Sequence, residues 1–331
     1  MTRSSTGAGL LLALTSAATF GTAGSFAGSL LDAGWTPGAA VIVRVTLAAV
    51  VLTLPALLAL RGYRRIHAGD LRTVGAFGVA GVAGAQLAYF QAVQHLSVAV
   101  ALLLEYSGVL LVVGWLWLRH GQRPGGLTFG GAGLAIGGLA LVLDLFGTQE
   151  LSLVGVLWGL GAAVGLAVYF VLSAKGDDAL PPVAIAWGGL VVGAATLGVT
   201  AAVGLLSWSS PRTEVVLAGA SMSWLVPVLA LSVVAGALAY VAGINGVRLL
   251  GAKVASFVGL TEVMFAVVFA WLLVDESLSA GQLLGGVLVL GGIALVRVDE
   301  LRTPVAAAAA AGDDDARNPP GRLVTATPAE G

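Results

Sequence analysis

Residues 99–117 read Ala99-Val-Ala-Leu-Leu-Leu-Glu105-Tyr106-Ser107-Gly108-Val-Leu-Leu-Val-Val-Gly-Trp-Leu-Trp117, an apolar run that is long enough to cross a lipid bilayer. A single carboxylate, Glu105, interrupts the run. A charged side chain at membrane depth costs from ~2.5 to more than ~10 kcal/mol, so it normally faces the protein interior or water and has a function. The stretch therefore predicts a membrane-spanning helix that carries a functional acid.

A second run of the same kind lies in the C-terminal half. It reads Val254-Ala-Ser-Phe-Val-Gly-Leu-Thr-Glu262-Val-Met-Phe-Ala-Val-Val-Phe-Ala-Trp-Leu-Leu273 and again holds one acid, Glu262. The rest of the chain is interpreted as the frame that holds these two helices.

The composition is that of a polytopic membrane protein. Of 331 residues, 58% are hydrophobic and 10% are charged, and the mean hydropathy is +0.98. A water-soluble domain of this size could not bury so much apolar surface. Cysteine is absent, which excludes a disulfide framework and a cysteine nucleophile, and the net charge of -1 gives no indication of a nucleic-acid partner.

Breaks in hydropathy predict an all-α membrane protein with ten transmembrane helices and no extramembrane domain between them. The predicted spans are 8–31, 38–60, 73–93, 98–118, 127–146, 151–172, 183–206, 223–243, 254–274 and 279–296.

The two halves of the chain resemble each other, which predicts two five-helix repeats over residues 8–146 and 151–297. Gly137-Gly-Leu-Ala-Leu-Val142 matches Gly291-Gly-Ile-Ala-Leu-Val296, and we pair Glu105 with Glu262 and Tyr89 with Tyr240. Because each repeat has an odd number of spans, the second repeat is inverted relative to the first. Inverted repeats are a recurring transporter architecture, with the substrate site near the midplane where the halves meet.

The placement of Lys and Arg orients the predicted bundle. With alternating spans, twelve of these residues, from Arg3 to Arg302, fall on one side, and the other side holds Arg212 alone among loop positions. The positive-inside rule therefore predicts that both termini are cytoplasmic. Residues 303–331, with an alanine run, three consecutive aspartates and several prolines, are predicted to be a disordered cytoplasmic tail.

Glu105 and Glu262 are the leading candidates for a functional site. Their functional interpretation is a proton-titrating or cation-pairing pair that lines a cavity, so that occupancy of the site can be coupled to protonation. The alternative is a structural carboxylate satisfied by Arg44 or by backbone donors. Arg44 itself has two open interpretations, since it can snorkel outward or can contact a glutamate or a substrate carboxylate.

Other polar and aromatic side chains are candidates to line the cavity. Gln86 and Tyr89 lie on one face of the third span, where an amide and a phenol suit a polar substrate or hydrogen-bond between helices. Tyr240 is their counterpart in the eighth span. Trp158, in the sixth span, could wall a cavity, although a packing role is the simpler interpretation.

Several other chemistries have no support in the sequence. Gly131-Ala-Gly133 resembles part of a dinucleotide fingerprint but lies in an apolar span, where helix packing explains it. The three histidines lack the spacing of metal ligands, and neither a zinc-protease motif nor a P-loop is present. We therefore expect no metal, no cofactor and no catalytic residues, and the protein is not expected to be an enzyme.

The chain resembles the drug/metabolite transporter superfamily, specifically its EamA-type transporters with two five-helix repeats. The resemblance is carried by Gly34-Trp-Thr-Pro37 leading to Arg44, by Ala99-Val-Ala-Leu-Leu-Leu-Glu105-Tyr106, and by Leu260-Thr-Glu262 followed by 270–278. The Leu-Glu-Tyr-Ser-Gly stretch is similar to that of threonine/homoserine exporters. Family members often have a proline soon after each glutamate, whereas this chain has Val109 and Val263.

The resemblance implies a secondary active transporter in the inner (plasma) membrane. It would export a small amino-acid-like metabolite or a xenobiotic by alternating access, with the proton as coupling ion and a cavity lined by the first, third, fourth, sixth, eighth and ninth spans. A lipid or polyprenyl-phosphate flippase on the same fold and, less favoured, an intramembrane enzyme are the alternatives. The substrate, the direction of transport, the identity of the coupling ion and the oligomeric state are left open.

Overall fold

In a computed structural model of the chain, the structure describes residues 3–63, 66–96, 98–143, 152–174, 180–274 and 279–317, without the side chains at 3–5, 99, 274 and 303–317. Helices account for nearly all of the described chain, and two short strands form a hairpin.

The N-terminal half begins with two helices that together make the first span. Its elements are α1 (Arg3–Gly21), α2 (Ala23–Asp32), α3 (Pro37–Leu60), α4 (Ala68–Ala76), the π-helix η1 (Phe77–Gly84), α5 (Ala85–Val93), α6 (Val98–Tyr106), α7 (Gly108–His120) and α8 (Gly126–Val142).

The C-terminal half adds the hairpin to a second set of helices. Its elements are α9 (Leu153–Ser173), α10 (Pro182–Ala202), β1 (Glu214–Leu217), β2 (Ala220–Ser223), α11 (Leu225–Ser232), the π-helix η2 (Val233–Leu238), α12 (Ala239–Leu250), α13 (Ala252–Gly259), α14 (Thr261–Val274) and α15 (Ala280–Arg317).

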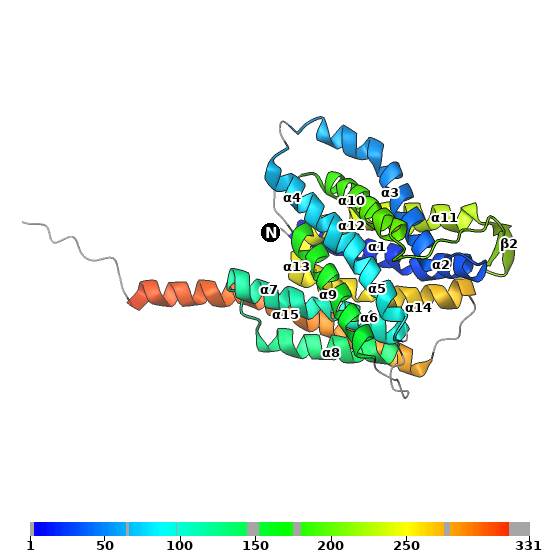
Figure 1. Cartoon of the computed structure of the whole chain (residues 1–331). Coiled ribbons are helices and arrows are strands. Elements are labelled where there is room, and N and C mark those ends of the chain that lie inside the picture. The colour runs from blue at the N-terminus through cyan, green and yellow to red at the C-terminus, as the bar shows by residue number, and fades with distance from the viewer. Residues whose placement is uncertain are drawn as a thin grey trace, which may run out of the picture.

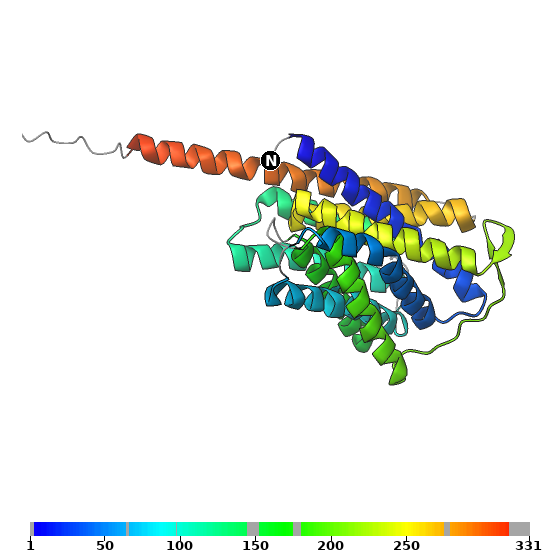
Figure 2. The ribbon, with the colours of Figure 1, turned by 90° about the horizontal axis from the view of Figure 1, so that it is seen from above.

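The predicted ten-span architecture is confirmed. Within the described ranges, nine continuous helical segments are long and apolar enough to cross a membrane, and α8 is a shorter apolar helix of 17 residues. At 1.5 Å per residue α8 is ~25 Å long, close to the thickness of a bilayer core. Figures 1 and 2 show the hairpin at one end of the bundle, whereas α15 leaves the bundle at the end that carries the N-terminus.

Local sequence explains where several helices begin and end. Thr36 accepts a hydrogen bond from the Ala39 backbone N–H (3.3 Å), and Pro37 occupies the first position of α3, where its missing N–H costs nothing. Ser152 accepts from Gly155 in the same way at the start of α9 (3.5 Å).

The packing of the helices has the symmetry of two repeats. The first helix of the first repeat, α1, packs against α12, α13 and α14, and the first helix of the second repeat, α9, packs against α5, α6 and α7. Two further large interfaces, α3 with α10 and α8 with α15, join equivalent helices. Exchanging the two halves therefore reproduces the same interfaces, and the two π-helices occupy equivalent places in the third and eighth spans.

Glycine allows the close crossing of α8 and α15. A Cβ atom at Gly131 would lie 2.7 Å from the carbonyl oxygen of Gly292, and one at Gly138 would lie 2.6 Å from that of Gly285. No larger residue fits at such a crossing without moving a backbone. The packing interpretation of Gly131 is thus confirmed.

The hairpin was not predicted, and it corrects two predicted span ends. The seventh span ends at Ala202 instead of residue 206, and the eighth begins at Leu225 instead of residue 223. The turn residues Ala218 and Gly219 both have positive φ (52° and 73°), as in the turns that favour two-residue hairpins. Of these two residues, only Gly219 is of a type that readily adopts a positive φ, so the sequence did not indicate the hairpin.

The predicted disordered tail is partly wrong. Helix α15 continues to Arg317, so residues 303–317 are helical, whereas 318–331 lie outside the described residues. The alanine run at 306–311 explains the difference, because alanine has the highest helix propensity of all residues.

Candidate functional site

A cavity of about 630 Å³ lies between the two repeats. Its described lining comes from the first, second, third, fourth, sixth, eighth and ninth spans, so the second span joins the six that were predicted. The volume is within the ~300–1,000 Å³ typical of pockets for small molecules.

The cavity extends to the hairpin end of the bundle. Leu31 and Pro37, which flank the connection between the first two spans, line it there, and so does Val98 at the start of α6. At the other end of the cavity, Val247 and Ala255 are only 2% exposed. The cavity is therefore closed toward the end of the bundle that carries the N-terminus.

Aromatic rings pack against one another at the closed end of the cavity. The Tyr169 ring lies 5.5 Å from that of Phe77 and 5.9 Å from that of Tyr240, and Phe77 has no exposed surface. These rings come from the third, sixth and eighth spans, and such pairs gain stability beyond their burial. We call Phe77, Tyr169 and Tyr240 the aromatic floor.

Each glutamate lies at a break in its span. Helix α6 ends one residue after Glu105, and α14 begins one residue before Glu262. At each break a hydroxyl group donates a hydrogen bond to a backbone carbonyl oxygen of the preceding turn. Ser107 donates to the Leu104 carbonyl oxygen (2.5 Å), and Thr261 donates to that of Val258 (2.7 Å). The spans are thus broken without the prolines that family members often have here.

The helix boundaries correct the predicted correspondence of the two glutamates. Equivalent helices begin at residues 85 and 239, 98 and 252, and 126 and 280, which are each 154 residues apart. This register pairs Glu105 with Gly259 and Glu262 with Gly108. The acids therefore lie on opposite sides of equivalent breaks, and their shift of about one helical turn keeps both facing the same cavity.

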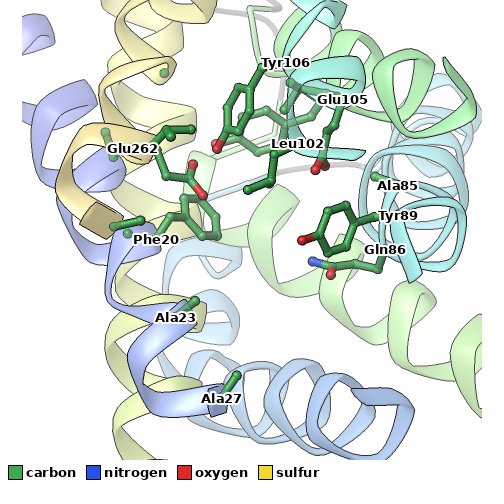
Figure 3. A pocket seen from close by; sticks show the side chains of 18 of the residues that line it. Phe20, Ala23, Ala27, Ala85, Gln86, Tyr89, Leu102, Glu105, Tyr106 and Glu262 are labelled. Atoms are coloured by element: carbon green, nitrogen blue, oxygen red, sulfur yellow. The ribbon is translucent and has the colours of Figure 1, made fainter. Parts of the chain in front are cut away.

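Glu105 points into the cavity from the first repeat. Figure 3 shows its carboxylate close to Tyr89 and Gln86, with Leu102 one turn earlier on the same helix and Glu262 on the opposite wall. Neither a hydrogen bond nor an ion pair joins Glu105 to another residue in the part of the chain that the structure describes.

Glu262 has closer polar neighbours. The Tyr106 hydroxyl is within hydrogen-bonding reach of its carboxylate, and the Arg44 guanidinium is near enough for electrostatic attraction. Tyr106 is 6% exposed and belongs to the first repeat, so it connects the two halves at this point.

Arg44 is fixed in place by two further contacts. It donates a hydrogen bond to the carbonyl oxygen of Ala235 in η2 (2.6 Å), and its guanidinium carbon lies 5.5 Å from the centre of the Phe20 ring. Arg44 is 9% exposed, so it lies within the bundle and does not snorkel outward. A cation over an aromatic face is stabilised by the ring quadrupole.

Most of the predicted lining residues meet in this cavity. The structure places Glu105, Glu262, Arg44, Gln86, Tyr89 and Tyr240 along its wall. Trp158 is the exception, because it is 39% exposed and does not line the cavity, which contradicts that prediction. On α9 it lies one turn before Gly161 and about two turns before Gly165, which pack against Ala88 and Ala85 of α5.

Two polar residues of the site were missed. Tyr106 follows Glu105 directly, but a tyrosine in an apolar span has no distinctive pattern. Tyr169 is not among the predicted lining residues, although it lines the cavity and also lies near Ser16. Only the three-dimensional packing shows what these hydroxyls face.

Two inverted five-helix repeats around a central cavity with intramembrane acids are the architecture of a class of membrane transporters. The chain belongs to the EamA-like transporter family, whose pattern matches residues 7–144 and again 153–298.

Two similar proteins are consistent with this family assignment. The chain is similar to "Uncharacterized inner membrane transporter YicL" of Salmonella typhimurium, at 23% identity over 238 residues that cover 70% of this chain and 74% of that protein. It is also similar to a protein of known crystal structure whose description names no function, with a TM-score of 0.69 and 19% identity over 88% of this chain and 97% of the other. The latter likeness shows the fold alone.

Proposed function

We propose that this membrane transporter is a proton-coupled exporter that moves a small amino-acid-like metabolite or a xenobiotic by alternating access. The observation that carries the proposal is the pair Glu105 and Glu262, one from each repeat, in a single cavity that is open at one end of the bundle. Intramembrane carboxylates that face a cavity are typical of proton and substrate pathways.

The excess of Lys and Arg at the terminus end supports an orientation with both termini in the cytoplasm. In that orientation the cavity faces the exterior, and the aromatic floor separates it from the cytoplasm. The structure then corresponds to an outward-open state.

The exchangeable interfaces of the two repeats support alternating access. In an inverted-repeat transporter, the second state arises when each repeat adopts the packing that the other had. Here α1 with α12 to α14 and α9 with α5 to α7 are the interfaces that would exchange. The broken fourth and ninth spans provide points at which the halves can bend.

A lipid-phosphate flippase fits this cavity less well. An anionic headgroup needs a basic site, and Arg44 is the single Lys or Arg among the described residues that line the cavity. The positive charge of Arg44 is already partly compensated by Glu262, and one of its N–H groups already donates to the Ala235 carbonyl oxygen.

The test is transport in proteoliposomes with an imposed pH gradient, using a panel of radiolabelled amino acids and cationic dyes. We expect the wild type to move at least one compound in response to the gradient and Glu105→Gln to lose this response. Glu214→Gln is the matched control, because Glu214 is exposed on β1 and bonds Ser221 (2.7 Å). Gradient-driven transport that persists in Glu105→Gln would contradict the coupling role.

A further inference from the structure

The charges that line the cavity do not balance. Three lining residues in the described part of the chain have charged side chains, namely Arg44, Glu105 and Glu262. When all three are ionised, the cavity carries one net negative charge. An uncompensated charge in a membrane interior is costly, so a functional state has to supply one positive charge.

Arg44 and Glu262 compensate each other. They attract each other, Tyr106 reaches Glu262, and Arg44 is additionally fixed by the Ala235 carbonyl oxygen and the Phe20 ring. This arrangement is a fixed pair of charges, with little reason to change when a ligand enters or leaves.

Glu105 carries the charge that remains. The titratable groups that face it are Tyr89 from α5, Tyr240 from α12 and Glu262 from α14, next to its own neighbour Tyr106, and none of them is a cation. The register of the repeats agrees with unequal roles, because the position equivalent to Glu105 is Gly259.

We propose that Glu105 is the binding site of a monovalent organic ammonium with an apolar body, which it exchanges for one proton, so that transport is electroneutral. This inference rests on the proposed function and deepens it by naming the stoichiometry and by narrowing the proposed substrates to amines with one net positive charge, which leaves out zwitterionic amino acids. Either the ammonium or one proton on the carboxylate brings the cavity to zero net charge. A zwitterion would leave the negative charge uncompensated.

The surroundings of Glu105 suit such a ligand. Figure 3 shows the Tyr89 ring beside the carboxylate, and Phe90 and Leu102 also line the cavity. An ammonium gains stability over an aromatic face as well as from the carboxylate. The remaining wall is largely apolar, including Phe20 and several alanines, and can hold the body of the ligand.

The first test compares ligands that share one apolar body and differ in charge. Binding of phenethyltrimethylammonium, phenethylamine, phenylalanine and phenylacetate is measured on purified protein in nanodiscs at pH 8. We expect the two cations to bind at least tenfold more tightly than the zwitterion and the anion. Phenylalanine that binds as tightly as phenethylamine, or an absence of cation binding, would overturn the inference.

The second test counts protons. The quaternary probe cannot titrate, so its apparent Kd should rise as the pH falls, with a limiting slope of tenfold per pH unit for one competing proton. We expect this slope to vanish in Glu105→Gln and to remain in Glu214→Gln. A limiting slope of a hundredfold per pH unit, or a slope that survives in folded Glu105→Gln, contradicts the one-proton exchange. Glu105→Asp keeps the charge and should retain the slope. This variant shows that a slope lost in Glu105→Gln reflects the lost charge and not a general intolerance of substitution at this position.

The third test separates this inference from the proposed function. In proteoliposomes, transport of the quaternary probe driven by a pH gradient should be unchanged when a potassium diffusion potential is imposed with valinomycin. A response to the potential overturns electroneutral exchange while leaving transport itself established. Selective cation binding without any transport leaves the site assignment intact and refutes the exporter.

Discussion

Glu105 and Glu262 are the same chemical group in one cavity, yet their neighbours differ. Glu262 has the Tyr106 hydroxyl and the Arg44 guanidinium nearby, whereas Glu105 faces a phenol and an amide. A hydrogen bond to a charged group contributes ~1.5–3 kcal/mol, so these neighbours are sufficient to give the two acids different roles.

Tyr106→Phe tests the role of the hydroxyl near Glu262. The substitution keeps the buried ring and removes only the donor, so we expect little change in thermal stability and a loss of transport of about tenfold, which corresponds to ~1.4 kcal/mol. The measurement is the initial rate of gradient-driven transport. In the Glu262→Gln background the same substitution should have a much smaller effect, and equal effects in both backgrounds would show that the hydroxyl acts elsewhere.

Substitution of Gly108 tests the close approach of α7 to α9. A Cβ atom there would lie 2.5 Å from the Ala163 carbonyl oxygen, so Gly108→Ala should destabilise the protein by ~1–3 kcal/mol. Gly114, on the same helix, has no atom within 4 Å of such a Cβ. Gly114→Ala should therefore be neutral or slightly stabilising. The check is the unfolding midpoint in detergent, and equal midpoints for the two variants would refute this packing.

At the scale of elements, one carboxylate organises the terminus end of the bundle. Asp299 of α15 accepts hydrogen bonds from the Thr128 hydroxyl (2.5 Å) and the Gly125 backbone N–H (3.1 Å), and it lies 3.6 Å from the Lys253 ammonium. It thereby caps the start of α8 and ties α8 to α15 and α13. Negative charge at a helix N-terminus is favourable.

Asp299→Asn should weaken this junction. Because the side chain is 9% exposed and the charge is lost near Lys253, we expect a destabilisation of ~1–2 kcal/mol, measured by thermal unfolding in detergent. Asp32→Asn is the matched control, since Asp32 is exposed at the end of α2, where removing a negative charge is neutral or favourable. A loss of stability in both variants would mean that the junction is not the cause.

Periodicity and hydropathy were sufficient to predict the spans, because an apolar run of ~20 residues has few other uses. They could not provide the register of the repeats. Two similar glutamates suggested one alignment, whereas the helix starts pair Glu105 with Gly259. A shift of three residues nearly preserves the helix face, so a pattern of side chains alone does not distinguish the two registers. The hairpin was missed for a related reason, because Ala218 is an unusual residue for a position with positive φ.

The sequence identified the charged residues of the cavity but only some of the aromatic ones. Glu105, Glu262 and Arg44 stand out in sequence because charge is rare in apolar runs. Tyr106 and Trp158 do not, since an aromatic residue in a span can face the cavity, another helix or lipid. Their placement depends on the packing of helices that are far apart in sequence.

At the scale of the whole molecule, the structure is open at one end only. This asymmetry, combined with the orientation proposed from the positive charges, predicts which side chains water reaches from each side of the membrane. The chain contains no cysteine, so a single introduced cysteine gives an unambiguous signal. Val98, at the mouth, and Val247, at the closed end, are suitable positions, with exposed fractions of 58% and 2%.

We expect a membrane-impermeant maleimide added to right-side-out vesicles to label Val98→Cys rapidly and Val247→Cys at least tenfold more slowly. Under conditions that favour the second state, alternating access predicts that labelling of Val247→Cys rises in inside-out vesicles and that labelling of Val98→Cys falls in right-side-out vesicles. Reciprocal changes are required, because opening one end has to close the other in a transporter of this design. Labelling of both positions from the same side would indicate a continuous channel, and labelling of Val98→Cys only in inside-out vesicles would reverse the proposed orientation.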